Sequence, residues 1–182
     1  MMAATPPTCD LMTIPARKEG RCNAMQTLDL ALLSDILPGG ALHKMSAFGA
    51  LSDSFLENLL ESSELLKLTT GETLYHQGER ADCFYVVLQG HLAIYQDSDA
   101  GREIIHTTGE GESVGFSAML AMRPRLLSGE ATSECIVLKI SSQALAKLQE
   151  LDNQQFSIFF INLSRDMSRF LSYCILRPPA EG

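Results

Sequence analysis

Hydrophobic and polar positions change their period twice along the chain. Between residues 65 and 140, short apolar runs alternate with turns rich in glycine and charged residues. Runs of this length, bounded by turns, predict short strands, and residues 97–101 predict a hairpin. Strands are expected over 65–68, 73–76, 83–88, 91–96, 102–108 and 130–140. The frequent turns favour an antiparallel, jelly-roll-like β-roll, so the fold class is mainly β with flanking α.

Helical periodicity flanks this strand region on both sides. Residues 26–37 carry apolar side chains at a helical spacing, and Pro38 ends the pattern. Ser52 is a good N-cap for the next helix. Residues 142–150 and 152–177 predict two C-terminal helices, the second of them long. We therefore expect an N-terminal tail with a short amphipathic helix over 1–43. One domain follows over 44–182, with its β-roll at about 64–140 and its C-terminal helices at about 142–177.

The long C-terminal helix carries an apolar stripe whose members are three or four residues apart. Such a stripe is typical of a coiled-coil seam. Two interpretations stay open: the helix is buried within its own chain, or it pairs with a second copy. We expect a parallel homodimer through this seam. The seam residues are Phe156, Phe160, Leu163, Met167, Phe170 and Cys174.

The candidate binding chemistry lies between residues 114 and 128. A turn of small residues begins at Gly115 and opens a short helix, and Arg125 follows. Backbone amides at a helix N-terminus attract an anion, and arginine is a forked, permanently charged phosphate donor. The pattern predicts a site for one phosphate group. The alternative for Arg125 is a surface ion pair with Glu110, Glu112 or Glu130.

Composition excludes several other functions. The net charge of −8 and the absence of any Lys/Arg-rich run argue against direct nucleic-acid binding. The five cysteines are scattered, which indicates structural thiols in a reducing cytosol, and no continuous apolar stretch is long enough to span a bilayer. Metal-binding histidine pairs, phosphate-binding loops and catalytic serine motifs are missing. We expect a cytoplasmic protein that is not an enzyme, with no metal and no membrane association.

Several motifs together carry a resemblance to a known family. They are Leu51-Ser52-Asp53, Gly71-Glu72-Thr73-Leu74, Gly78-Glu79-Arg80-Ala81-Asp82, Phe84-Tyr85-Val86-Val87-Leu88-Gln89-Gly90 and Asp99-Ala100-Gly101-Arg102-Glu103. In this order they resemble the cyclic nucleotide-binding domain of the catabolite activator and regulatory kinase subunit superfamily. The resemblance covers residues 46–173, most of the chain.

The resemblance implies roles for a phosphate-binding cassette. By it, Arg125 would pair with the cyclic phosphate, the amides of Ser117 and Ala118 would point at the same oxygens, and Ser128 would offer a hydroxyl. The cassette residues are Gly115, Phe116, Ser117, Ala118, Arg125, Leu126, Leu127 and Ser128.

Two positions depart from the family pattern. Phe116 replaces the family glutamate that accepts from the ribose 2′-hydroxyl, and Leu127 replaces a small residue. Losing a charge-assisted hydrogen bond costs about 1.5–3 kcal/mol, or roughly 10- to 150-fold in affinity. Three outcomes remain open. They are a changed nucleotide, such as a cyclic dinucleotide or a purine stacked on Phe116, a different effector, and a cavity filled by its own side chains.

The resemblance also sets the expected function. In the transcription-factor branch a helix-turn-helix domain follows the long helix, whereas this sequence ends at Gly182. We expect a regulatory sensor that binds cAMP, cGMP, cyclic di-GMP or a related phosphate-bearing effector without any required cofactor. It would signal through dimer rearrangement or a protein partner. The alternative is a degenerate domain that binds no nucleotide and serves as a dimeric interaction module. Haem-based gas sensing is a third hypothesis, and the colour of the purified protein would reveal it.

Overall fold

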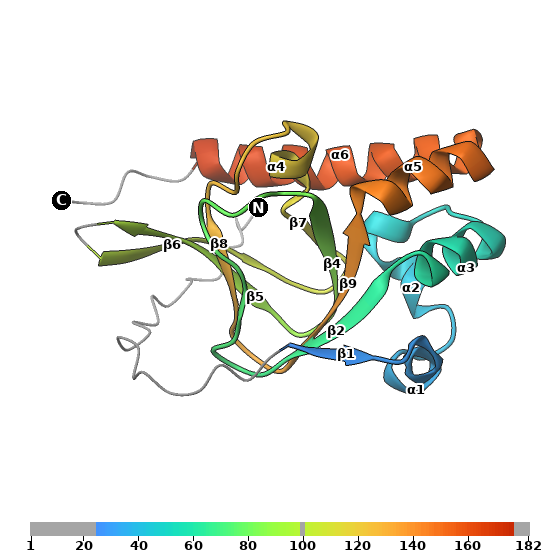
Figure 1. Cartoon of the computed structure of the whole chain (residues 1–182), viewed down its shortest axis with the longest axis horizontal. Helices are drawn as coiled ribbons and strands as arrows, with labels where there is room; N and C mark the ends of the chain where they lie inside the picture. The colour runs from blue at the N-terminus through green and yellow to red at the C-terminus, as the bar shows by residue number, and fades with distance from the viewer. Residues whose placement is uncertain (1–24, 99–100, 177–182) are drawn as a thin grey trace, which may run out of the picture.

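Two antiparallel sheets form the centre of the molecule in the computed structural model, which describes residues 25–98 and 101–176 (Figure 1). The strands are β1 (Gln26–Leu28), β2 (Glu64–Leu68), β3 (Thr73–Tyr75), β4 (Cys83–Gln89), β5 (Leu92–Ser98), β6 (Gly101–Thr108), β7 (Ser113–Val114), β8 (Ser128–Ala131) and β9 (Cys135–Ser141). One sheet has the order β1-β2-β9-β4-β7 and the other β3-β8-β5-β6. The predicted β-roll is confirmed.

Helices cover one side of this roll. They are the short turns η1 (Leu30–Leu32), α1 (Leu33–Ile36), α2 (Ala41–Lys44), η2 (Ser46–Phe48) and α4 (Phe116–Leu120), and the longer helices α3 (Asp53–Glu61), α5 (Ser142–Leu151) and α6 (Asn153–Leu176). Figure 1 shows α6 running along the roll, with α4 beside it. None of the helices within residues 25–98 and 101–176 is long and apolar enough to cross a membrane.

The alternation along β4 explains why its whole run is apolar. Phe84, Val86 and Leu88 join the core cluster shared with the helices. Cys83, Tyr85 and Val87 belong to a second cluster inside the roll, between the two sheets. Successive side chains of a strand point to opposite faces, so a strand covered on both faces needs apolar residues at every position.

Two sequence predictions need correction. Residues 26–37, expected as one amphipathic helix, begin instead with β1, which pairs antiparallel with β2 and is followed by η1 and α1. Apolar periodicity over so short a stretch does not distinguish a strand followed by turns from a helix. Residues 130–140, expected as one strand, divide into β8 and β9, which belong to different sheets. The proposed boundary at residue 43 stays a prediction.

The long helix α6 begins at Asn153, directly after Asp152, the residue at which the sequence predicted its start. The Asp152 Oδ1 accepts hydrogen bonds from the backbone amides of Gln154 (3.1 Å) and Gln155 (3.0 Å). These bonds satisfy two of the amides that a helix N-terminus leaves without partners.

Much of the stripe assigned to a dimer seam contacts this chain's own roll, while five of its six residues stay partly exposed, so the seam itself stays a prediction. Leu163 is fully buried in the core, and the Phe160 ring lies 5.8 Å from the ring of Phe116. Met167 and Phe170 line the cavity described below, Phe156 packs against the core, and Cys174 is half-buried. Apolar residues repeating at intervals of three and four mark the apolar face of a helix. This spacing does not show whether the same chain or a second chain packs on that face. Dimerisation itself stays a prediction.

Candidate functional site

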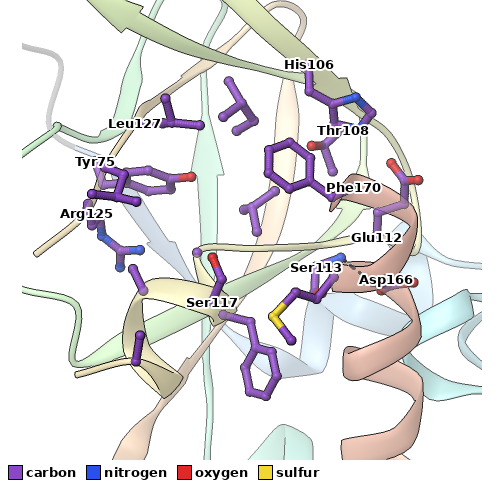
Figure 2. Close-up of a pocket in the computed structure, with 18 of the residues that line it drawn as sticks. Tyr75, His106, Thr108, Glu112, Ser113, Ser117, Arg125, Leu127, Asp166 and Phe170 are labelled. Carbon is purple, nitrogen blue, oxygen red and sulfur yellow. Dashed lines mark hydrogen bonds between the residues drawn. The ribbon is translucent and has the colours of Figure 1, made fainter. Parts of the chain in front are cut away.

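A cavity of about 550 Å³ lies between the roll, α4 and α6 (Figure 2). Strands β3, β5, β6 and β7 contribute to its wall, and α6 supplies Asp166, Met167, Arg169 and Phe170. The loop over residues 121–127 closes the remaining side. The predicted cassette therefore borders a real cavity, and the long helix shares the same wall.

Arg125 is the central charged group of this site. Its side chain is only 3% exposed. One guanidinium nitrogen, Nη2, donates to the Cys83 carbonyl oxygen at 2.9 Å and lies 3.5 Å from the Cys83 Sγ. The other nitrogen, Nη1, is buried and has no hydrogen-bond partner within the described structure. A buried, half-satisfied guanidinium is costly, which is the condition under which an added anion stabilises a site.

Two tyrosine rings hold the guanidinium in place. Its central carbon lies 4.2 Å from the centre of the Tyr75 ring and 5.5 Å from that of Tyr85, and the two rings stack 5.9 Å apart. Burial raises the pKa of Tyr75 to about 12, although Arg125 opposes the rise. Burial raises the pKa of Tyr85 as well. Both phenols are therefore neutral at pH 7 and supply no counter-charge to the arginine.

The surface ion pair considered for Arg125 is absent from the described part of the chain. Glu130 pairs instead with Arg102 at 2.9 Å. Glu110 Oε1 accepts from the Gly90 amide at 3.3 Å, and Glu112 Oε2 accepts from the Gly109 amide at 2.9 Å. Each of the three carboxylates that could have paired with Arg125 thus has another partner.

Gly115 allows Arg125 to approach the start of α4. Its φ of 78° lies in the left-handed region, and a Cβ atom at this position would lie 2.3 Å from Arg125 Nη1. Any side chain here would collide with the guanidinium, so this position requires glycine for space as well as for conformation. The unpartnered Nη1 is consequently held directly beside the first turn of α4.

Phe116 does not fill the cavity. Its side chain is 2% exposed, and its ring packs edge-on against Phe84 at 5.1 Å and Phe160 at 5.8 Å. With its ring packed against two core rings, Phe116 offers little free surface to a purine, and stacking on it, one of the three open outcomes, stays untested. Ser117 instead points its hydroxyl into the cavity, as Figure 2 shows.

The other cassette residues divide between wall, surface and core. Ala118 and Leu127 line the cavity, and Leu127 also packs against the core of the roll. Leu126 borders the cavity but is 72% exposed. Ser128 is buried, and its Oγ accepts from the Gln77 amide at 2.9 Å, which gives this hydroxyl a structural role. The expected phosphate contacts of these residues stay predictions.

Asp166 joins α6 to the strand that leads into the cassette. Its carboxylate accepts from Ser46 Oγ at 2.9 Å and from the Ser113 amide at 3.2 Å, and it pairs with Arg169. Burial raises the pKa of this carboxyl, while its hydrogen bonds and Arg169 oppose the rise. Ser113 is two residues before Gly115, so the position of α6 and that of the cassette are mechanically linked.

The far end of the cavity is formed by β6 and the last turns of α6. The ring of His106 lies 5.4 Å from that of Phe170 and 4.8 Å from that of Tyr173. Burial lowers the pKa of His106, although the nearby Glu112 opposes this. The histidine is therefore neutral at pH 7. Within the described residues no group of acidic, histidine and cysteine side chains could hold a metal ion.

Sequence reasoning missed Tyr75 and Asp166. Tyr75 lies on a three-residue strand, and nothing local in the sequence connects it with Arg125, which is fifty positions later. Asp166 did carry a signal. It falls beside Leu163 and Met167 on the apolar face of a long helix, where an isolated acidic residue needs a partner.

Comparison with known proteins relates this architecture to a family. Residues 65–152 match the family model described as cyclic nucleotide-binding domain. The crystal structure of a cyclic nucleotide-binding domain from Methylobacillus flagellatus superposes with a TM-score of 0.72 at 22% identity, over 87% of this chain and 90% of that chain.

Two curated relatives are similar over shorter shares of their own length. The cAMP-dependent protein kinase regulatory subunit of Yarrowia lipolytica is 27% identical over 101 residues, which are 56% of this chain and 26% of that protein. Patatin-like phospholipase domain-containing protein 6 of Homo sapiens is 22% identical over 140 residues, which are 76% of this chain. This chain spans 10% of the length of that phospholipase relative. The family match and the shared roll show that residues 65–152 of this chain match the cyclic nucleotide-binding domain family.

Proposed function

We propose that this protein is a regulatory sensor that binds a cyclic nucleotide, or a related phosphate-bearing effector, in the cavity beside Arg125. The cavity volume of about 550 Å³ falls in the range of small-molecule sites, roughly 300–1,000 Å³. The family match over residues 65–152 supports the nucleotide class, and the name of the Yarrowia lipolytica kinase subunit points to cAMP as the first ligand to test.

One observation carries the proposal: Nη1 of Arg125 is buried without a partner and faces Gly115 at the cavity wall. A phosphate oxygen placed there would complete the hydrogen bonding of the guanidinium and neutralise its charge. Charge-assisted hydrogen bonds of this kind are stronger than neutral ones, and the surrounding tyrosine rings keep the arginine in a fixed orientation.

Signalling would pass through α6. An effector in the cavity touches the cassette on one side and Met167 and Phe170 on the other. Such a ligand shifts the position of α6 if it binds one arrangement of the helix more tightly than another. We propose that the outer face of α6, where Ile161 is 48% and Ile175 70% exposed, then meets a second copy or a protein partner. No catalytic step is proposed.

A cytoplasmic location is also proposed. The three described cysteines, Cys83, Cys135 and Cys174, are free thiols, and two of them are buried. Free buried thiols suit a reducing compartment.

Calorimetry of the full chain with cAMP, cGMP and cyclic di-GMP tests the proposal. We expect one of these ligands to bind saturably, and we expect Arg125→Gln to abolish the heat of binding. Arg102→Gln is the matched control, because Arg102 also stacks on a tyrosine, Tyr95, at 3.6 Å, but does not line the cavity. If none of the three ligands binds at millimolar concentration, the alternative of a non-binding interaction module takes the place of the sensor.

A further inference from the structure

The cavity wall near Arg125 carries a short, uncharged polar side chain, Ser117. In Figure 2 the hydroxyl of Ser117 points into the cavity between Arg125 and α6. Tyr75, on the other side of the guanidinium, is a neutral phenol because its pKa is raised by burial. A ligand whose anionic group pairs with Arg125 would thus place its adjoining atoms next to Ser117.

The carboxylates that line the cavity lie at its opposite end and are already engaged. Figure 2 places Glu112 and Asp166 across the cavity from Arg125. Asp166 accepts from Ser46, Ser113 and Arg169, and Glu112 accepts from the Gly109 amide. Hydroxyl groups next to the bound phosphate would therefore meet no charged acceptor from the part of the chain that the structure describes.

Much of the cavity wall is apolar. The apolar lining includes Ile94 and Val114 on the roll, Leu127 after the cassette, and Met167 and Phe170 on α6. Such a wall favours a flat aromatic or aliphatic ligand body, since burying apolar surface is favourable while burying an unpaired polar group is costly.

We propose that this site selects its ligand by one anionic group and an apolar body, and that it does not read the hydroxyl groups of a sugar next to the phosphate. The ligand class is a phosphoester with an aromatic or aliphatic body, and a cyclic nucleotide belongs to this class through its phosphate and base. Ser117 is the residue that sets this selectivity. The inference rests on the proposed function, because it concerns the same site beside Arg125.

A quantitative consequence follows for the ribose 2′-hydroxyl. Because Ser117 is short and is not held against the 2′-hydroxyl, removal of this hydroxyl from cAMP changes affinity by about threefold or less, whereas a formed neutral hydrogen bond would be worth about 2- to 13-fold. A site with a carboxylate acceptor at the same place would lose roughly 10- to 150-fold. The affinity ratio of cAMP to 2′-deoxy-cAMP therefore separates the two cases.

The test is calorimetry of the full chain with four probes: cAMP, 2′-deoxy-cAMP, 1-naphthyl phosphate and inorganic phosphate. We expect cAMP and 2′-deoxy-cAMP to bind within about threefold of each other, 1-naphthyl phosphate to bind, and inorganic phosphate to bind at least tenfold more weakly. Ser117→Gln offers an acceptor oxygen without adding charge beside Arg125, and we expect it to raise the preference for cAMP at least fivefold. Ser54→Gln is the control, because Ser54 lies in the first turn of α3 and does not line the cavity.

The outcomes separate this inference from the proposed function. A wild-type preference above tenfold for cAMP overturns the inference and leaves the nucleotide sensor standing. Binding of 1-naphthyl phosphate without either nucleotide supports the inference and overturns the nucleotide sensor. Binding of none of the organic probes overturns both. If Ser117→Gln leaves the affinity ratio of cAMP to 2′-deoxy-cAMP unchanged, the role given to Ser117 is overturned.

Discussion

Replacing Arg125 with methionine separates the stabilising role of this side chain from its binding role. The guanidinium contributes one charge-assisted hydrogen bond to the Cys83 carbonyl, worth about 1.5–3 kcal/mol, and contacts with two tyrosine rings worth about 0.5–2 kcal/mol each. Against these stands the cost of burying a charge whose Nη1 has no partner, several kcal/mol. Methionine keeps much of the apolar volume. We therefore expect the free energy of unfolding without ligand to change by less than about 2 kcal/mol.

The effect on ligand binding is expected to be far larger. A ligand at 100 times its dissociation constant adds about 2.7 kcal/mol to the stability of the wild type. For a chain of this size that corresponds to a rise in Tm of about 5–11 °C. Arg125→Met should show no such rise at the same ligand concentration, because the anion then has no cationic partner at the wall beside Gly115.

Differential scanning fluorimetry with and without cAMP measures both effects in one experiment. Arg102→Met is the control, and it should keep the full ligand-induced rise. A variant Arg125→Met that keeps its ligand-induced rise would refute the role given to the guanidinium. A loss of more than about 4 kcal/mol without ligand would refute the view that the charge is incompletely satisfied.

Three further changes probe the glycine, the buried carboxylate and the helix. In urea denaturation, Gly115→Ala should lower the free energy of unfolding by about 1–3 kcal/mol more than Gly71→Ala does. Both glycines have positive φ, but only a Cβ atom at Gly115 would collide with Arg125. Equal losses of unfolding free energy in the two variants would contradict this. Burial raises the pKa of Asp166, so the folded state binds the proton more readily and the unfolding free energy should fall as pH rises above about 4 through the raised pKa. In urea denaturation between pH 4 and 7, Asp166→Asn should not show this fall in unfolding free energy. If the unfolding free energies of wild type and variant change with pH in parallel, Asp166 is not the group responsible. Ile161→Glu should yield monomers by light scattering if the outer face of α6 forms a dimer, and an unchanged dimer mass would exclude that face.

The sequence was sufficient for the roll because its signals are local. Apolar runs bounded by glycine turns gave β4 and β5 within a few residues, and Ser52 and Asp152 cap the helices that they were predicted to begin. Residues 26–28 were missed as a strand because β1 depends on pairing with β2, a contact that local periodicity does not contain.

The site was only partly predictable for a related reason. The sequence indicated that Gly115 and Arg125 act together, and the structure places them in contact range. It could not show which way Phe116 turns, because that depends on Phe84 and Phe160, which are distant in sequence. The apolar stripe of α6 was likewise visible, but its spacing does not say whether a second chain or this chain's own roll covers it.

The most direct test of the central claim is nitrogen NMR of the arginine side chains during a titration with cAMP, or with whichever phosphate probe binds by calorimetry. The Arg125 guanidinium signal is assigned by its loss in Arg125→Met. We predict that this signal shifts saturably with the same dissociation constant that calorimetry gives, while the Arg102 signal stays in place. Saturable binding by calorimetry with an unmoved Arg125 signal would contradict the account.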